Sequence, residues 1–336
     1  MYQLIIGIDI SKKTLDWCVT QNKQVLAQYK EDNKPNVIAR RLRGISKQFG
    51  VPASDILVCA EYTGKYIYPL TVACPEVGAC LWLENAYYIS CYYKRERGKN
   101  DSVDAHRIAI YAHKNQDDAR PYNSTTENLQ RLKALLSQRQ DFLEEHVKYK
   151  AKITDAKGFM SEHLYADSSA RWKELADMSA SLGKSVEKEI NNIIQTDPKL
   201  ARQYELLTSI PGIGRVTAWL VISSTDGFTK FQTASEYCCY VGAAPFRYTS
   251  GSSVRSSTHV SNRANKELKR QIHMAALVAT TICKSGHFHD YYLRKIAEGK
   301  NKMVVINAVR SKLITTMFAV VRDNVKFDVR LKYTKK

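Results

Sequence analysis

The sequence has no paired-cysteine motif and no long apolar run, and these absences exclude several protein classes. None of its eight cysteines forms a C-x-x-C pair, so we expect no zinc site. No uninterrupted run of about 18 apolar residues is present, so we expect no membrane-spanning helix. The N-terminus enters a predicted strand at once, which argues against a secretion signal. Together, these absences favour a soluble, intracellular protein with reduced thiols.

Acidic residues are scarce beside basic ones. The chain has 33 Asp and Glu against 51 Lys and Arg, which gives a formal net charge of +18. Such a surplus favours a polyanionic partner, most often nucleic acid. An anionic membrane surface is the alternative, but neither end carries a basic amphipathic segment that would anchor the chain there. The length of 336 residues suits two or three domains.

An apolar run at residues 4–11 ends next to a single acid and organises the N-terminal part. Isoleucine fills four of its eight positions, which predicts a buried strand. Asp9 then lies inside or at the mouth of a hydrophobic sheet. A buried carboxylate is unfavourable unless it is paired or binds a metal. The alternative is an acid at a strand end that caps the turn begun at Ser11.

The following segments predict an α/β domain. Residues 14–20 and 24–29 suit two further strands, joined by short turns and therefore antiparallel. A basic helix at 36–49, a buried strand at 56–60, a helix at 66–73 and a strand at 79–83 follow. This order is typical of a ribonuclease-H-like domain. Glu61 ends the fourth strand, so it lies beside Asp9 if the first and fourth strands pair in parallel.

Residues 94–109 place a basic cluster before two acids. Asp101 opens a predicted helix and Asp104 follows three residues later, so both carboxylates share one helix face. The alternative is ordinary helix-start chemistry, in which acids favour the first turn. With Asp9 and Glu61 they make four carboxylates, the hard oxygen ligands that suit Mg²⁺ and phosphoryl transfer. The cluster that would hold the phosphate backbone is Lys94, Arg95, Arg97 and Lys99.

Glycine and proline nearly vanish from residues 123 to 200, where Glu, Lys, Gln, Ala and Leu dominate. Leucines recur at helical spacing, with interruptions, which predicts a long antiparallel helical pair. The pair packs on itself or, as a coiled-coil element, on another protomer. We therefore expect three segments, with boundaries at 1–122, 123–203 and 204–336.

Residues 207–218 read as two helices joined by Pro-Gly-Ile-Gly. This pattern matches a helix-hairpin-helix element, in which backbone N–H groups approach a phosphate. Gly212, Gly214 and Arg215 would make that contact. A plain corner between two helices is the alternative.

A Ser/Gly loop at residues 247–258 stands between an apolar helix and a basic helix at 262–279. A flexible linker is the simplest interpretation, but the loop lies between two predicted helices and does not separate domains. Ser250 lies between Arg247 and Arg255, and arginines can orient a phosphate and stabilise its transition-state charge. A serine hydroxyl needs such activation to act as a nucleophile. Arg263 and Lys266, at the start of the basic helix, would add phosphate contacts.

These landmarks, in this order, resemble the IS110 family of bacterial insertion-sequence transposases, which carry a DEDD acidic set. The resemblance covers nearly the whole chain. It rests on residues 7–12 (GIDISK), 61–64 (EYTG), 99–105 (KNDSVDA), 210–214 (IPGIG), 242–245 (GAAP), 250–251 (SG) and 261–268 (SNRANKEL). The chain departs from the pattern at Ala264, where glycine is usual.

The resemblance implies a RuvC-like N-terminal domain in which Asp9, Glu61, Asp101 and Asp104 hold Mg²⁺. It implies a C-terminal domain in which Ser250 attacks DNA and forms a covalent phosphoserine link; Ser252 and Ser253 are the alternative nucleophiles. Family members use a structured bridge RNA from their own element to choose donor and target DNA. They act as homo-oligomers, dimers or tetramers, in the bacterial cytoplasm at the nucleoid, with no membrane partner.

Two other functions stay open on the residues alone. A RuvC-like nuclease or junction resolvase would use metal-activated water, with the Ser/Gly loop only binding phosphate. A non-catalytic nucleic-acid-binding protein would keep the fold without the chemistry, although four convergent carboxylates argue against it.

Overall fold

The computed structural model describes the chain in two compact units, Met1–Ser124 and Thr125–Lys336. The described residues are 2–92, 101–122, 126–246, 249–250, 254–255, 259–260, 264–284 and 286–328. The division into three segments expected from the sequence stays a prediction.

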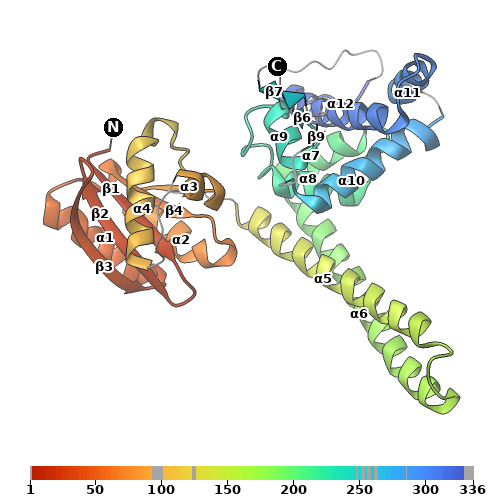
Figure 1. Ribbon diagram of the computed structural model, residues 1–336, viewed down its shortest axis with the longest axis horizontal. Helices are drawn as coiled ribbons and strands as arrows, with labels where there is room; N and C mark the ends of the chain where they lie inside the picture. Colours follow the sequence, from red (N-terminus) through yellow and green to blue (C-terminus); the bar gives the residue numbers. More distant parts are fainter. Residues whose placement is uncertain are drawn as a thin grey trace. The chain divides into compact units, whose positions relative to one another are not determined.

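The first unit is built on a sheet with the strand order β3-β2-β1-β4-β5 (Figure 1). The first three strands are antiparallel neighbours, whereas β1 and β4 pair in parallel, as do β4 and β5. The strands are β1 (Leu4–Ile10), β2 (Thr14–Gln21), β3 (Gln24–Asp32), β4 (Ile56–Glu61) and β5 (Cys80–Glu84). The elements follow one another along the chain in the predicted ribonuclease-H-like order. The parallel pair of β1 and β4 at the centre of the sheet meets the condition under which Asp9 and Glu61 lie side by side.

Helices cover both faces of this sheet. Alternate residues of β1 point to opposite faces, so Leu4, Ile6 and Ile8 pack in one cluster with residues of α1 (Pro35–Phe49) and α2 (Tyr68–Val77). Ile5 points the other way and packs with Ile108 of α4 (Asp101–Lys114). The short helix α3 (Ala86–Tyr92) contributes Ile89 to that second layer and was not predicted. β1 and β4 are therefore buried on both faces, as their continuous apolar sequences indicate.

The second unit begins with two long antiparallel helices, α5 (Glu127–Ala156) and α6 (Glu162–Thr196), as predicted. At one end of the pair, Leu132 and Ile190 are fully buried in the main core of the unit. The other end extends away from the remaining helices (Figure 1), and there Val147, Phe159 and Leu164 are exposed. The interrupted leucine pattern thus corresponds to a pair that packs on the unit at one end only.

The remaining helices surround one core that contains Trp219, Tyr237 and Leu313. They are α7 (Pro198–Thr208), α8 (Arg215–Ser224), α9 (Ala234–Val241), α10 (Lys266–Leu277), α11 (His287–Ala297) and α12 (Lys302–Asp323). A π-helical turn, Val278–Ile282, continues α10. By length and composition alone α12 could span a membrane, but 61% of its apolar window is buried inside the unit. It is therefore the central core helix here.

Candidate active site

Two predicted acids end adjacent parallel strands of the first unit. Ile8 of β1 pairs with Ala60 of β4, so Asp9 and Glu61 are the next residues along two neighbouring strands. Both side chains are partly buried. Asp9 follows Ile5 by four residues, and Glu61 follows Leu57 by four, so each acid lies on the same face of the sheet as that apolar residue. Ile5 and Leu57 pack in the α4-side cluster. The two carboxylates therefore lie on the sheet face that α4 covers.

The close approach of α4 to the sheet depends on Gly7. A Cβ atom at this position would lie 2.2 Å from the carbonyl oxygen of Ala105 and 2.3 Å from the backbone nitrogen of Ala109. Ala105 and Ala109 also form a small buried cluster with Cys18 of β2. Small residues on strand and helix thus let α4 lie directly on the strand that ends in Asp9.

This approach brings Asp104 close enough to act on Glu61. Burial raises the pKa of the Glu61 carboxyl, and the negative charge of Asp104 raises it further. Asp104 is also ion-paired with Arg107 at 3.0 Å, one turn along α4. Two carboxylates that repel each other at the ends of buried elements favour a cation between them. The donor set therefore fits Mg²⁺, which prefers hard oxygen ligands.

Asp101 is the first residue of α4, as predicted, but its side chain lies outside the described part of the chain. Among the side chains that are described, no group of three His, Cys, Asp or Glu is close enough to hold a metal. The role of all four acids as metal ligands therefore stays a prediction.

Sequence reasoning missed two further acids in the same row across the sheet. Asp16 of β2 pairs with Asp9, and Glu84 of β5 pairs with Glu61. Asp16 is held by Lys30 at 3.3 Å. Glu84 accepts hydrogen bonds from the Tyr111 hydroxyl at 3.3 Å and from the Asn85 N–H at 2.6 Å. The signal for Glu84 was available, because it follows the apolar run of residues 79–83 as Glu61 follows 56–60.

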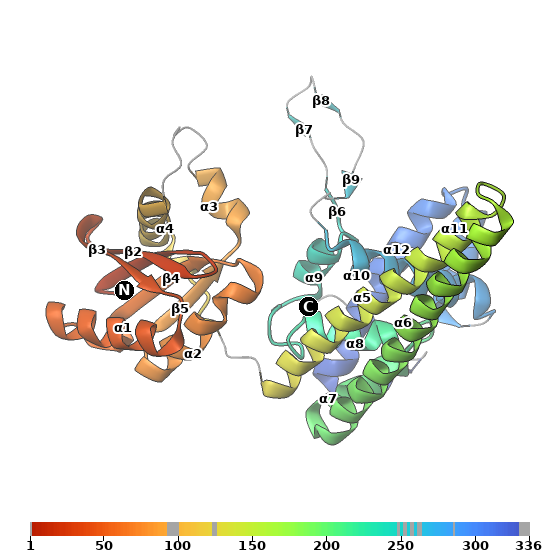
Figure 2. The ribbon, with the colours of Figure 1, turned by 90° about the horizontal axis from the view of Figure 1, so that it is seen from below.

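The predicted Ser/Gly loop contains a β-hairpin, which corrects the expectation of a plain loop. Pro245–Phe246 (β6) pairs with His259–Val260 (β9), and Thr249–Ser250 (β7) pairs with Val254–Arg255 (β8), both antiparallel. We call residues 245–260 the serine hairpin. Figure 2 shows β7 and β8 farther from the helices of the unit than β6 and β9. Ser250 therefore lies near the tip of a projecting two-stranded element, opposite Val254; its side chain lies outside what the structure describes.

Comparison with known proteins decides the family. Residues 6–156 match the family model of the DEDD transposases of the IS110 type, and residues 204–293 match the transposase family IS116/IS110/IS902. The chain belongs to the IS110/IS116 family of transposases. It is accordingly a DNA recombination enzyme, and its N-terminal unit, with the strand order described above, is RuvC-like.

Two relatives are similar to this chain over nearly its full length. The pilin gene-inverting proteins of Moraxella lacunata and Moraxella bovis are each 27% identical to it, over 98% of this chain and 99% of theirs. An insertion element IS110 protein of Streptomyces coelicolor is 30% identical over 44% of this chain and 35% of its own length. The similarity to the Moraxella proteins therefore includes both units.

Two solved structures of RuvC are similar to part of this chain. Thermus thermophilus RuvC in complex with a Holliday junction substrate has 14% sequence identity and a TM-score of 0.28, over 36% of this chain and all of RuvC. A second Thermus thermophilus RuvC structure has 15% identity and a TM-score of 0.26.

The residues predicted to contact nucleic acid are only partly described. Lys94, Arg95, Arg97, Lys99, Arg247 and Arg263 lie outside the described residues, as does the side chain of Arg255. Lys266 is exposed at the start of α10. These contacts stay predictions.

One glycine of the Pro-Gly-Ile-Gly turn is required by packing. A Cβ atom on Gly212 would lie 2.4 Å from the carbonyl oxygen of Ala275, so this glycine lets the turn pack against α10. Gly214 precedes the first residue of α8 and has open space around it. Arg215 is ion-paired with Glu187 of α6 at 2.6 Å. Packing alone explains Gly212, and the phosphate contact of this turn stays a prediction.

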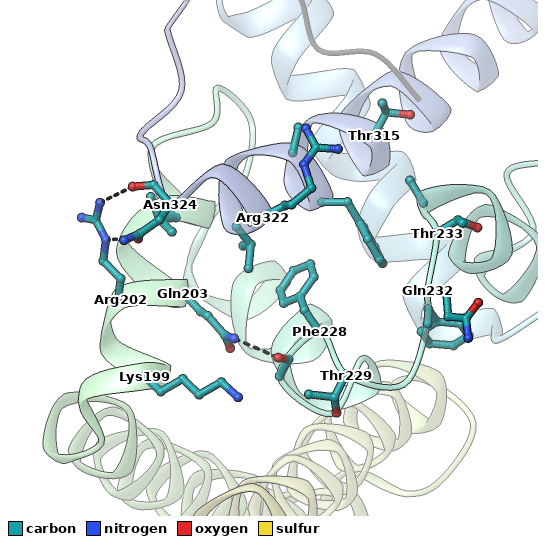
Figure 3. A pocket seen from close by; sticks show the side chains of 17 residues that line it. Lys199, Arg202, Gln203, Phe228, Thr229, Gln232, Thr233, Thr315, Arg322 and Asn324 are labelled. Carbon is teal, nitrogen blue, oxygen red and sulfur yellow. Dashed lines mark hydrogen bonds between the residues drawn. The ribbon is translucent and has the colours of Figure 1, made fainter. Parts of the chain in front are cut away.

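A separate cavity of about 530 Å³ lies in the second unit between α7, residues 227–234 and the end of α12. Figure 3 shows Lys199, Phe228 and Gln232 around it. It contains none of the predicted site residues, so it is distinct from the catalytic candidates.

Proposed function

We propose that this transposase cuts and rejoins donor and target DNA through a serine nucleophile, guided by a structured RNA of its own element. The observation that supports DNA cutting at the acidic site is the geometry of the acids: Asp9 and Glu61 follow the paired ends of two parallel strands, and Asp104 is close enough to raise the pKa of Glu61. A set of carboxylates kept close in spite of their repulsion is expected where a cation and a phosphate must be bound.

Ser250 is the proposed nucleophile, with Ser252 and Ser253 as the alternatives. Its Oγ forms a bond to a DNA phosphorus, while the bond from that phosphorus to one deoxyribose oxygen breaks. The hydroxyl proton passes to a base, and the departing deoxyribose oxygen takes up a proton. Attack by another strand end on the phosphoserine reverses these changes, so the joined DNA is made without an external energy source.

The acidic residues would act on the same phosphate. Asp9, Glu61, Asp101 and Asp104 would hold Mg²⁺, which supplies positive charge to the phosphoryl group. Arg247 and Arg255 on the serine hairpin would orient the phosphate by paired hydrogen bonds. Arg107 donates a hydrogen bond to Asp104 at 3.0 Å and orients that carboxylate.

The net charge of +18 fits DNA and RNA as partners, because their polyanionic backbones attract a positively charged protein. The exposed apolar side chains at the far end of α5 and α6 suit a homo-oligomer, because a second copy would cover them. In such a dimer or tetramer the serine of one protomer could act with the acids of another. The protein would work in the bacterial cytoplasm, on nucleoid DNA.

A second candidate activity is suggested by the names of the full-length Moraxella relatives. A pilin gene-inverting protein that is similar along 98% of this chain suggests that the same cut-and-join reaction inverts a DNA segment. Inversion and transposition use the same serine chemistry and differ in the arrangement of the two DNA sites. A plasmid that carries inverted copies of the element ends would report inversion by restriction mapping.

The test of the serine is a trapping assay. The protein is incubated with Mg²⁺, its element-derived RNA and labelled DNA ends, then denatured and examined for label on the chain. We expect an adduct that maps to Ser250 and is absent in Ser250→Ala but present in Ser252→Ala and Ser253→Ala. Cleaved DNA without any adduct would favour the alternative, a RuvC-like nuclease or junction resolvase with activated water. Joining that persists in Asp104→Asn would refute the metal site.

A further inference from the structure

A buried cation lies in the middle of α12. Arg310 is only 6% exposed, and it lies between Val309 and Leu313 of the main core. Burial lowers the pKa of its guanidinium. No acidic side chain among the described residues lies within ion-pair distance of it, in contrast to Arg322 at the end of the same helix, which pairs with Asp323 at 2.7 Å. A buried guanidinium without a counter-ion is unfavourable for folding.

Arg310 and two neighbouring side chains of α12 reach a short stretch of backbone at the end of α9. Its Nη2 donates to the carbonyl oxygen of Gly242 at 3.2 Å, and its Nη1 donates to Oδ1 of Asn307 at 3.0 Å. The Nδ2 of Asn307 and the hydroxyl of Ser311 both donate to the carbonyl oxygen of Ala243, at 3.1 and 3.2 Å. Three side chains from one face of α12 thus hold two consecutive carbonyls. We call Asn307, Arg310 and Ser311 the hairpin clamp.

These carbonyls lie at the base of the serine hairpin. Gly242 ends α9 in a left-handed conformation with φ of 72°, and Pro245 begins β6 two residues after Ala243. The other end of the hairpin returns to the same place, because the Asn265 N–H donates to the carbonyl oxygen of Tyr240 at 3.1 Å. Both strands that lead to Ser250 therefore start from the end of α9, which α12 fixes.

We propose that the hairpin clamp is a positioning device for the serine nucleophile. By fixing the base of the hairpin, Arg310 limits the directions in which its tip can present Ser250 to a phosphate. This inference rests on the proposed function of Ser250. The simpler explanation is that Arg310 is a cation that caps the C-terminal end of α9 and serves only stability.

The two explanations predict different behaviour for Arg310→Met. Methionine fills a similar volume without charge. Removing a buried charge that has no counter-ion is favourable for folding and offsets the loss of the hydrogen bonds to Gly242 and Asn307. A positioning role therefore predicts an unfolding temperature at or above that of the wild type, with adduct formation on saturating DNA slowed about a hundredfold, as for a misplaced reacting group. A purely stabilising role predicts a lower unfolding temperature and an adduct rate that recovers on cooling.

The measurements are single-turnover adduct rate, DNA affinity and thermal unfolding, for wild type, Arg310→Met, Asn307→Ala and the control Arg322→Met. We expect slow adduct formation at unchanged DNA affinity in the first two variants and a wild-type rate in the control. A wild-type adduct rate in Arg310→Met overturns the proposal, and so does a rate loss that follows loss of folding.

Hydrogen exchange separates this inference from the proposed function. The amides of Ala243 and Asn265 donate to carbonyl oxygens of α9, so their exchange reports the base of the hairpin without any catalysis. Faster exchange there in Arg310→Met, with unchanged exchange in α8, supports the clamp even if the wild type forms no adduct. Unchanged exchange at both amides overturns it.

Discussion

Replacing Gly7 by alanine tests the contact on which the acidic site depends. The added Cβ would lie 2.2 Å from the Ala105 carbonyl oxygen, whereas real Cβ atoms essentially never approach closer than 3.0 Å. The obstacle is backbone, so a side-chain rotation cannot relieve it. The helix must retreat from β1 by about 0.8 Å to reach 3.0 Å and about 1.2 Å to reach an ordinary contact of 3.4 Å.

Two effects follow from that displacement. Overpacking at a buried site destabilises by about 1–3 kcal/mol, so the unfolding temperature of the first unit should fall. Asp104 moves with α4 relative to Asp9 and Glu61, and a misplacement of about 1 Å can slow catalysis about a hundredfold. Gly7→Ala should therefore lose most of its DNA-joining activity at a temperature where the protein is still folded.

The matched control is Gly44→Ala, in the interior of α1. A Cβ atom there meets nothing within 4 Å, and alanine is better than glycine in a helix by about 1 kcal/mol. We expect this variant to be slightly more stable and fully active. Thermal unfolding and a strand-transfer assay with Mg²⁺ measure both. If Gly7→Ala joins DNA at the wild-type rate, the close packing of α4 on β1 does not determine the geometry of the acids.

Two further predictions concern the acids and the long helices. Burial and Asp104 raise the folded-state pKa of Glu61 above its usual value of 4.5. Its ionised form therefore opposes folding fully above the folded-state pKa, and this penalty shrinks as the pH falls below that pKa and is gone below about 4.5. Glu61→Gln should therefore unfold at a higher temperature than the wild type at pH 7 in EDTA, while losing DNA joining; a lower unfolding temperature would refute the repulsion. Phe159, in the turn between α5 and α6, is 88% exposed and should contribute to self-association. Phe159→Ser should therefore reduce the fraction of oligomer in analytical ultracentrifugation without a change in thermal unfolding. An unchanged oligomer fraction would argue against this surface.

Much of the first unit could be predicted because its signals are local. Strand alternation and short turns along residues 4–32 are enough to predict three antiparallel strands. The continuous apolar run before Glu61 indicates a strand covered on both faces, and the structure buries that strand on both faces beside β1. The position of an acid at a strand end is likewise a property of the chain alone.

The serine hairpin could not be predicted in the same way. Its strands are only two residues each, with the sequences PF, TS, VR and HV, so neither length nor alternation distinguishes them from a loop. Their pairing depends on the two ends being held together at α9, a contact between Tyr240 and Asn265 that no local pattern encodes.

The sequence by itself determined the elements, their order and the acids at the strand ends, because periodicity and residue type act over a few positions. Only the tertiary structure decided that Gly7 lets α4 pack closely on β1 and that Asp104 then raises the pKa of Glu61. It also decided that Arg310 is buried at the base of the serine hairpin. Each of these depends on contacts between segments far apart in the chain, and burial and charge coupling are set by such contacts.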